Sequence, residues 1–420
     1  MPPAGPHTAP AKLWNRDYLL LLQGQVVSQV GDAFYMLAVF WFVYRKTGSP
    51  LATGTVMTCM VLPYVFLGPL AGRVIDRVNK RQVLVGADLA RGLIVGGVTL
   101  LAWLGRLEVW QIYAAVGLAA CCTVFFNPAV TASIPCLVPP QDMIRANSLG
   151  GMASNLAAVV SPLVGGVAIA AVGVELAFLI NAVSYVLSAA SEMFISPARL
   201  APSAAQKAGS RQGLKETIAA LRAQPTLFRL ICASLVVNFF GMAVILIPIF
   251  AVGRLGGSSV ELGVISSSYA AGALVAILVL STRGPRLNQG KLIPPLLGVF
   301  GLGFLVLGLH LDLATAVGVM VVLGLCATTT RMCYLTIMQR RIDRHMHGRA
   351  FGVIMAADTG LQPATYLVTG ALVEAISLET TLVVFGLCVL AGAAYLFRLP
   401  GLAELAPPAD REAQDRKGVE

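Results

Sequence analysis

The stretch Gly72-Arg-Val-Ile-Asp76-Arg77-Val-Asn-Lys80-Arg81 lies between two long apolar runs of this chain. It packs four cations and one carboxylate into a turn too short to be a free linker. Gly72 allows two helices to approach closely at the end of the apolar run that precedes this stretch. Asp76 can pair with a neighbouring arginine or accept hydrogen bonds from a helix N-terminus. From residue types alone, the string is either a functional turn or a topology anchor.

The composition on either side of this string indicates a membrane protein. Of the 420 residues, 57% are hydrophobic and only 12% are charged, and the mean hydropathy is +0.79. A soluble domain is nearer half apolar and a quarter charged. The chain therefore has too little polar surface to cover a water-soluble globule.

Apolar runs long enough for membrane-spanning helices of about 20 residues recur along the whole chain. Continuous runs of this length exclude barrel strands of about ten residues, and in lipid only helices or closed barrels satisfy their backbone. We predict an all-α integral membrane fold of twelve transmembrane helices in two six-helix bundles. The runs are 18–44, 51–71, 83–104, 109–133, 150–172, 176–195, 228–251, 260–281, 292–310, 313–337, 351–373 and 380–397.

One long connection, from Ser196 to Pro225, divides these runs into six and six. Leu214, Ile218 and Leu221 share a face there, which predicts a helix lying at the membrane interface or a solvated linker helix. The predicted parts are an N-tail (1–16), an N-terminal bundle (17–196), a central loop (197–226), a C-terminal bundle (227–399) and a C-tail (400–420).

The two halves show faint internal similarity at one loop. Arg77-Val-Asn-Lys-Arg follows the second run, and Arg286-Leu-Asn-Gln-Gly-Lys follows the eighth. Duplicated six-helix halves with a site between them are a recurring transporter plan.

The positive charges orient the chain. With twelve spans and both termini on one side, that side receives 24 lysines and arginines and the other receives four, while Arg91 and Arg331 fall inside spans. The positive-inside rule then predicts both termini in the cytoplasm and a multi-pass protein of the cytoplasmic cell membrane. The net charge of +10 is thus a topology signal, and no nucleic-acid partner is expected.

No cofactor or metal is expected. All eight cysteines fall within or at the ends of apolar runs, and none has a CxxC or histidine partner at metal spacing. No G-x-x-x-x-G-K-[ST] phosphate loop is present. Energy for transport must then come from an ion gradient, a solute gradient or a partner chain.

The string from Gly72 to Arg81 resembles the loop motif G-x-x-x-D-R-x-G-R-K of the major facilitator superfamily, with Asn79 in place of the second glycine. Ser28-Gln-Val-Gly-Asp32 in the first run and Asp88-Leu-Ala-Arg91 in the third add to the likeness. The chain is similar to the drug-efflux branch that includes macrolide exporters, and to related siderophore exporters.

For this loop, the resemblance implies a cytoplasmic gate. Asp76 would be a latch toward the start of the eleventh helix near Arg349, and the missing second glycine puts the geometry of the turn in question. The gate residues implied are Gly72, Asp76, Arg77, Lys80 and Arg81.

The fifth run carries a second family-like string, Ser161-Pro162-Leu-Val-Gly165-Gly166. It resembles an exporter motif that ends G-P-x-x-G-G. A proline with small neighbours also bends a helix and permits tight packing without any antiport. Both interpretations stay open.

Ionisable residues inside spans are costly in lipid and are usually functional or paired. Gln25, Ser28, Asp32 and Tyr35 recur at spacings of three, four and three, so they share one helix face that points into the bundle or into a wet cavity. Asp32 is therefore either a proton-coupling carboxylate or part of a packing network.

Further ionisable residues occupy other spans. Asp88 and Arg91 are three apart, which favours a local ion pair. Arg331 and Asp358 lie on adjacent spans and are expected to form an interhelical pair, either structural or coupling. Glu192 is expected at the interface.

In the family that the chain resembles, the first, fourth, seventh and tenth helices line the cavity. The resemblance makes Asp32, Asn127, Asn238 and Arg331 candidates for one central site, with Gln25 and Ser28 beside them. Interhelical hydrogen bonding explains the asparagines equally well.

The predicted function is secondary active transport by a monomer, namely proton-coupled export of amphiphilic small molecules such as drugs or macrolides by alternating access. Its partners would be the substrate, protons and the lipid bilayer. The alternatives are a uniporter, or a lysophospholipid or siderophore transporter of the same fold. An intramembrane enzyme would need a clustered histidine, aspartate or serine constellation, and the four histidines lie in a tail, at a helix end and in a loop.

Overall fold

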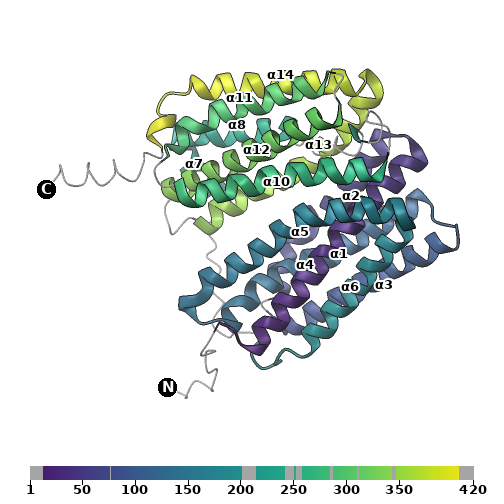
Figure 1. Cartoon of the computed structure of the whole chain (residues 1–420). Helices are drawn as coiled ribbons and strands as arrows, with labels where there is room; N and C mark the ends of the chain where they lie inside the picture. The colour runs from purple at the N-terminus through teal and green to yellow at the C-terminus, as the bar shows by residue number, and fades with distance from the viewer. Residues whose placement is uncertain are drawn as a thin grey trace, which may run out of the picture. The chain divides into compact units, whose positions relative to one another are not determined.

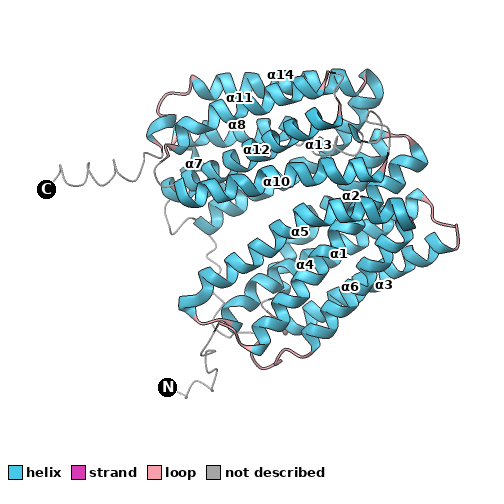
Figure 2. Cartoon of the chain, in the orientation of Figure 1, coloured by secondary structure: helices cyan, strands magenta, loops and turns pink. Residues whose placement is uncertain are grey.

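The structure is a computed structural model that describes residues 13–75, 77–200, 214–241, 250–251, 258–283, 287–309, 312–342 and 347–405. Within these ranges the regular structure is helical and no strand occurs (Figure 2). The long helices, labelled in Figure 1, are α1 (Arg16–Thr47), α2 (Pro50–Ile75), α3 (Lys80–Trp103), α4 (Val109–Leu137), α5 (Met143–Val172), α6 (Val174–Met193), α8 (Pro225–Gly241), α10 (Ser259–Arg283), α11 (Gln289–Leu307), α12 (Leu313–Arg341), α13 (His347–Ile376) and α14 (Leu378–Phe397). Shorter elements are α7 (Leu214–Arg222), η1 (Pro140–Asp142) and η5 (Leu402–Glu404).

Each of the twelve apolar runs lies mostly on a helix as far as it is described: the seventh lies on α8 and residues 250–251, and the ninth lies on α11 up to Leu307. Ten helices among the described residues are long and apolar enough to cross a membrane, and α8 and α13 carry the other two runs. The predicted all-α, twelve-helix membrane fold is confirmed.

Local chemistry, more than hydropathy, sets where the helices end. At the start of α1 the Asn15 side chain accepts a hydrogen bond from the Tyr18 amide at 3.0 Å. At its end Gly48, with φ of 63°, donates its amide to the Tyr44 carbonyl at 2.7 Å. The helix thus outruns the apolar stretch 18–44 at both ends.

Two compact units divide the chain. The first comprises Met1–Gly48, Thr55–Gly209 and Ser258–Gly263, and the second comprises Ser49–Gly54, Ser210–Gly257 and Val264–Glu420. The division is reciprocal, because the first turn of α2 belongs to the second unit and the first turn of α10 belongs to the first.

Glycines allow helices to touch in both units. In the first unit, a Cβ on Gly24 of α1 would lie 2.9 Å from the Ser188 hydroxyl of α6. In the second unit, Gly301 of α11 and Gly386 of α14 face each other, and a Cβ on either would lie within 2.9 Å of the other's carbonyl oxygen. Small residues at such crossings let backbones approach in a membrane bundle.

A matching turn joins the last two helices of each six-helix half. Gly173, between α5 and α6, has φ 91° and ψ 173°. Ser377, between α13 and α14, has φ 87° and ψ 160°. Among the described residues, Ser377 is the one non-glycine residue with positive φ. The repeated geometry supports the internal duplication that the loop similarity suggested.

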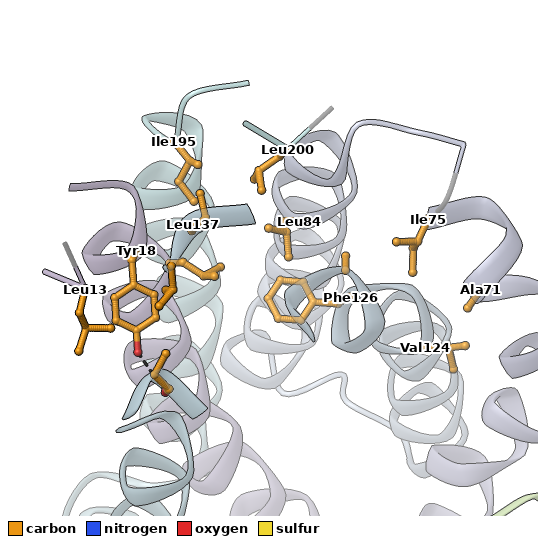
Figure 3. Packing of buried hydrophobic residues seen from close by; sticks show 14 residues of the cluster. Leu13, Tyr18, Ala71, Ile75, Leu84, Val124, Phe126, Leu137, Ile195 and Leu200 are labelled. Atoms are coloured by element: carbon orange, nitrogen blue, oxygen red, sulfur yellow. Dashed lines mark hydrogen bonds between the residues drawn. The ribbon is translucent and has the colours of Figure 1, made fainter. Parts of the chain in front are cut away.

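One hydrophobic cluster closes an end of the first unit, where α1, α3 and α4 meet the residues that follow α6 (Figure 3). The Tyr18 hydroxyl in this cluster donates to the Ala146 carbonyl at 3.0 Å. Ile195 and Leu200 are buried in it. The first residues of the central connection are therefore part of the packed unit.

Candidate functional site

Charge is buried in the interior of the first unit. Asp88 and Arg91 of α3 form an ion pair through one carboxylate oxygen and one guanidinium nitrogen, and their side chains are 0% and 2% exposed. The predicted local pair is confirmed. An ion pair this deeply buried needs further compensation, since desolvation of two charges is costly.

Two aromatic rings supply part of that compensation for Arg91. Its Cζ lies 4.1 Å from the ring centroid of Phe126 on α4 and 4.4 Å from that of Tyr185 on α6. A desolvated guanidinium this close to two aromatic rings is stabilised by cation–π interaction. The two rings hold the charge at the junction of α3, α4 and α6.

Asp32 joins the same cluster from α1, because the Tyr185 hydroxyl donates a hydrogen bond to its carboxylate. Ser28 and Tyr35, which share its helix face, are buried. A Cβ on Gly31 would collide with the Ser184 hydroxyl of α6, so this part of α1 lies directly against α6. The polar stripe of the first span therefore faces the bundle interior.

Glu192 corrects an expectation. It was predicted at the interface, but the structure buries it completely, at 0% exposure. Neither of its carboxylate oxygens has a hydrogen-bond partner among the described residues. The hydropathy pattern predicts correctly that Glu192 lies near the end of its span. It does not predict which way the side chain points, because that depends on the rotation of the helix about its axis.

The second unit presents its polar residues differently. The Asn238 amide of α8 donates to a carboxylate oxygen of Asp358 on α13 at 3.1 Å, and Arg331 of α12 is exposed. Within the described residues no ion pair joins Arg331 to Asp358. The expected pairing of these two residues is wrong, because an uncharged amide takes the place of the guanidinium.

Both candidate asparagines make interhelical hydrogen bonds. Asn127 of α4 donates to the Tyr64 hydroxyl of α2 at 3.3 Å, and its side chain is exposed, as is that of Asn238. Gln25 is half-buried, and its Nε2 has no partner among the described residues. A shared site for Asp32, Asn127, Asn238 and Arg331 stays a prediction.

The loop from Gly72 to Arg81 contains a turn at Asn79 whose backbone and side-chain contacts are defined. Asn79 has φ of −68° and ψ of 120°, an extended conformation that needs no glycine. Its side chain caps α3 by accepting from the Arg81 amide at 3.0 Å, and it donates to the Pro197 carbonyl at 3.0 Å. Replacement of the family's second glycine thus has a local structural reason.

Two residues of this loop contact the chain at and after the end of α6, Arg81 through its side chain and Lys80 through its backbone amide. The Arg81 guanidinium donates to the Met193 carbonyl, and the Lys80 amide donates to the Leu200 carbonyl at 3.1 Å. Gly72 and Arg77 are exposed, and a Cβ on Gly72 would meet no atom of the described residues within 4 Å, so the close helix approach expected at Gly72 is not found. Asp76 and the side chain of Arg349 lie outside the described residues, and the gate that they would form stays a prediction.

The string in α5 makes close helix contacts. A Cβ on Gly165 would lie 3.3 Å from Leu37 of α1, and one on Gly166 would collide with the Ser259 carbonyl. The Ser259 hydroxyl, in the part of α10 that belongs to the first unit, donates to the Gly166 carbonyl at 2.8 Å. Ser161 is buried and Pro162 lies inside the helix. These contacts agree with a role of the string in close helix packing, and its role in export stays a prediction.

The contribution of α6 to this cluster was not predicted from the sequence. Tyr185 links Asp32 to Arg91, yet a single tyrosine in an apolar run attracts no notice. A periodic signal was present: small polar residues recur along the run at spacings of three, four and three, and all are buried in the structure. They are Asn181, Ser184, Ser188 and Ser191.

Several known proteins are similar to this chain in sequence or in fold. The chain is 27% identical over 408 residues to the multidrug efflux pump Tap of Mycobacterium tuberculosis, with 93% of this chain and 96% of that protein covered. It is 24% identical over 306 residues to macrolide efflux protein A of Streptococcus pyogenes, with 70% and 74% covered. A bacterial homologue of the lysosomal transporter Spinster has the same fold, with a TM-score of 0.71, 15% identity, and 96% and 98% of the two chains covered.

The family model described as Major Facilitator Superfamily matches residues 21–361, which is most of the chain. The match includes the loop from Gly72 to Arg81 and the helices that carry the buried charges. Together with the twelve-helix fold, it makes the protein a multi-pass membrane transporter similar to drug-efflux proteins. The chain belongs to the major facilitator superfamily.

Proposed function

We propose that this transporter exports amphiphilic small molecules from the cytoplasm in exchange for protons, by alternating access. Efflux relatives named for macrolides and for multiple drugs support export and the substrate class. The positive-inside count supports a cell-membrane location with both termini in the cytoplasm. The chain carries no nucleotide-binding string, and among the remaining energy sources we propose an ion gradient, that of protons.

The observation that carries proton coupling is the position of Asp32. Its carboxylate lies in the interior of the first unit, accepts from Tyr185, and feels the charges of Arg91 and Asp88. A carboxylate in such surroundings interacts strongly with its neighbours in the charged form and weakly in the neutral form. Gain or loss of one proton at Asp32 therefore changes the forces between α1 and α6.

Other residues are assigned supporting roles. Asp358 and Arg331 would contact substrate or assist coupling from the second unit, with Asn238 oriented by Asp358. Gly72, Asp76, Arg77, Lys80 and Arg81 would form the cytoplasmic gate. Asn127 and Asn238 are exposed amides that can bind a polar group of an amphiphilic substrate.

Everted membrane vesicles test the coupling, because export then becomes uptake into the vesicle. We expect uptake of a macrolide driven by an imposed pH gradient to be lost in Asp32→Asn. Asp312→Asn is the matched control, since Asp312 is an exposed carboxylate that precedes α12. Unchanged pH-driven uptake by Asp32→Asn would remove Asp32 from the mechanism.

A second measurement separates the exporter from a uniporter or lipid facilitator of the same fold. Substrate added to the purified protein in weakly buffered detergent solution should release protons from the wild type and not from Asp32→Asn. Downhill transport without proton release would favour the facilitator.

A further inference from the structure

Glu192 is a buried carboxylate that the proposed function does not use. It is the penultimate residue of α6 and is 0% exposed. Both of its carboxylate oxygens are buried and have no hydrogen-bond partner among the described residues. A bare carboxylate in an apolar interior is among the most costly groups that a membrane protein can contain.

Contacts on both sides of Glu192 fix its level in the bundle. One residue earlier, the Ser191 hydroxyl donates to the Leu20 carbonyl of α1 at 2.8 Å. One residue later, the Met193 carbonyl accepts from Arg81 of α3. Further along α3, a Cβ on Gly92 would lie 3.5 Å from the Cβ of Tyr185. Glu192 therefore lies beside the segment of α3 that contains Asp88.

The register also relates Glu192 to Asp32. Tyr185, which donates to Asp32, precedes Glu192 on α6 by two helical turns, or about 10 Å along the axis. Asp88 and Arg91 occupy the adjoining stretch of α3 between these levels, and the charges of both act on Glu192. The carboxyl groups of Asp32, Asp88 and Glu192 thus lie at successive levels along α6, where it packs against α1 and α3.

Other titratable groups near Glu192 are already engaged. On α1, Asp17 accepts from the Ser196 amide at 3.3 Å and pairs with Arg199 at 3.2 Å. Arg81 is directed to the Met193 carbonyl. Helix α5, which also packs on α6, carries no titratable side chain after Arg145.

The charges of the cluster do not balance. Asp32, Asp88 and Glu192 face one guanidinium, that of Arg91, and if all four were ionised the cluster would carry a net charge of −2. Arg91 is already paired with Asp88 and covered by two rings. Protons on Asp32 and Glu192 would bring the cluster to neutrality, and Glu192, with no donor to either oxygen, gains most from one.

We propose that Glu192 is a second proton-binding site of this transporter and that it exchanges the coupling proton with Asp32 by way of Asp88. In this scheme Arg91 stays charged and offsets the one carboxylate that remains ionised. Glu192, two turns closer than Asp32 to the predicted cytoplasmic end, would pass the proton on to that side. The exchange rests on the proposed proton coupling, whereas the presence of a proton on Glu192 does not.

Infrared spectroscopy of the purified protein tests the site itself. The wild type at neutral pH should show carbonyl stretching absorption of protonated carboxylic acids that shifts in D₂O, and the band due to Glu192 should disappear in Glu192→Gln. Glu175→Gln, at the other end of α6, is the matched control and should keep the band. A spectrum identical in wild type and Glu192→Gln would overturn the proposal.

Vesicle transport tests the exchange. Glutamine is nearly isosteric with protonated glutamate but cannot release a proton. Glu192→Gln should lose pH-driven uptake while it keeps substrate exchange at equal pH, and Glu192→Asp should recover part of the driven uptake. Full driven uptake by Glu192→Gln would show a merely structural group and would also overturn the proposal.

The two proposals fail separately. If Glu192→Gln loses driven uptake and the infrared band while Asp32→Asn retains driven uptake, Asp32 is wrong and the proton site at Glu192 stands. If the band is absent while Asp32→Asn loses driven uptake, the Glu192 site is wrong and the proposed function stands.

Discussion

The two halves of this transporter share backbone devices but not buried chemistry. Each half has an asparagine cap after its second span, Asn79 and Asn288, and a turn of positive φ before its last span, at Gly173 and Ser377. Yet every charged residue that is buried in the described parts of the chain lies in the first unit. The second unit buries only uncharged polar groups there. The two halves thus share their turns, whereas the buried charged residues of the described chain all lie in the first unit.

Removal of an arginine from each half gives the largest expected contrast. Arg91→Leu leaves Asp88 buried without its partner, and a broken buried ion pair typically costs about 3–5 kcal/mol. Arg331→Leu changes an exposed side chain and should cost less than about 1 kcal/mol. Thermal unfolding in detergent measures both.

A double variant is the control for Arg91. Asp88→Leu combined with Arg91→Leu removes both charges, and part of the lost stability should return because an apolar pair needs no compensation. Equal destabilisation by Arg91→Leu and Arg331→Leu would contradict the contrast between the two units.

Most of the fold was predictable from the sequence because long apolar runs are a physical consequence of the thickness of a bilayer. The ends of the helices were not, since they depend on single caps such as Asn15 and on the left-handed Gly48. A capping side chain can let a helix continue beyond its apolar stretch, and a hydropathy pattern does not show where such a helix ends.

The candidate site was predictable only in part. The spacing of Asp88 and Arg91 predicts their ion pair because both lie on one helix, where periodicity fixes the geometry. Partners on different helices depend on rotation and tilt, which a single sequence does not contain. Tyr185 as the donor to Asp32, and Asn238 as the donor to Asp358, were therefore out of reach.

The matching turns of positive φ give the next contrast. Gly173→Ala places a Cβ on a residue with φ of 91° and against the Glu175 carboxylate, at a cost of about 1–3 kcal/mol. Ser377→Gly relieves the strain at φ 87° and should raise stability by up to about 1 kcal/mol, because greater freedom of the unfolded chain offsets part of the relief.

Shifts of the unfolding temperature in opposite directions would confirm that the two turns are equivalent. Gly318→Ala, a helical site in α12 where a Cβ would meet no atom within 4 Å, shows the effect of a glycine replacement without strain. A loss of stability in Ser377→Gly would mean that the serine contributes more as a cap, by accepting from the Thr380 amide at 3.4 Å, than it costs in strain.

Replacement of the asparagine caps is expected to change the stability least. At these caps the two halves should respond alike. Asn79 accepts from the Arg81 amide and Asn288 from the Lys291 amide, each at 3.0 Å. Replacement of either by alanine should cost about 1 kcal/mol, and by glycine only a few tenths. Asn79→Ala should be the more costly of the two, because Asn79 also donates to the Pro197 carbonyl at 3.0 Å.

Asn79→Asp separates these two contributions, since a carboxylate keeps the acceptor for the helix amide but cannot donate to Pro197. The two contributions are independent if the fall in unfolding temperature of Asn79→Asp equals the fall in Asn79→Ala minus the fall in Asn288→Ala. A gain of stability in Asn79→Gly would contradict the extended φ of −68° at this position, because a turn that needs no glycine gains nothing from one. The asparagine that departs from the family motif would then be a tolerated substitution, and the anchor between the Asn79 loop and the central connection would be weaker than its geometry indicates.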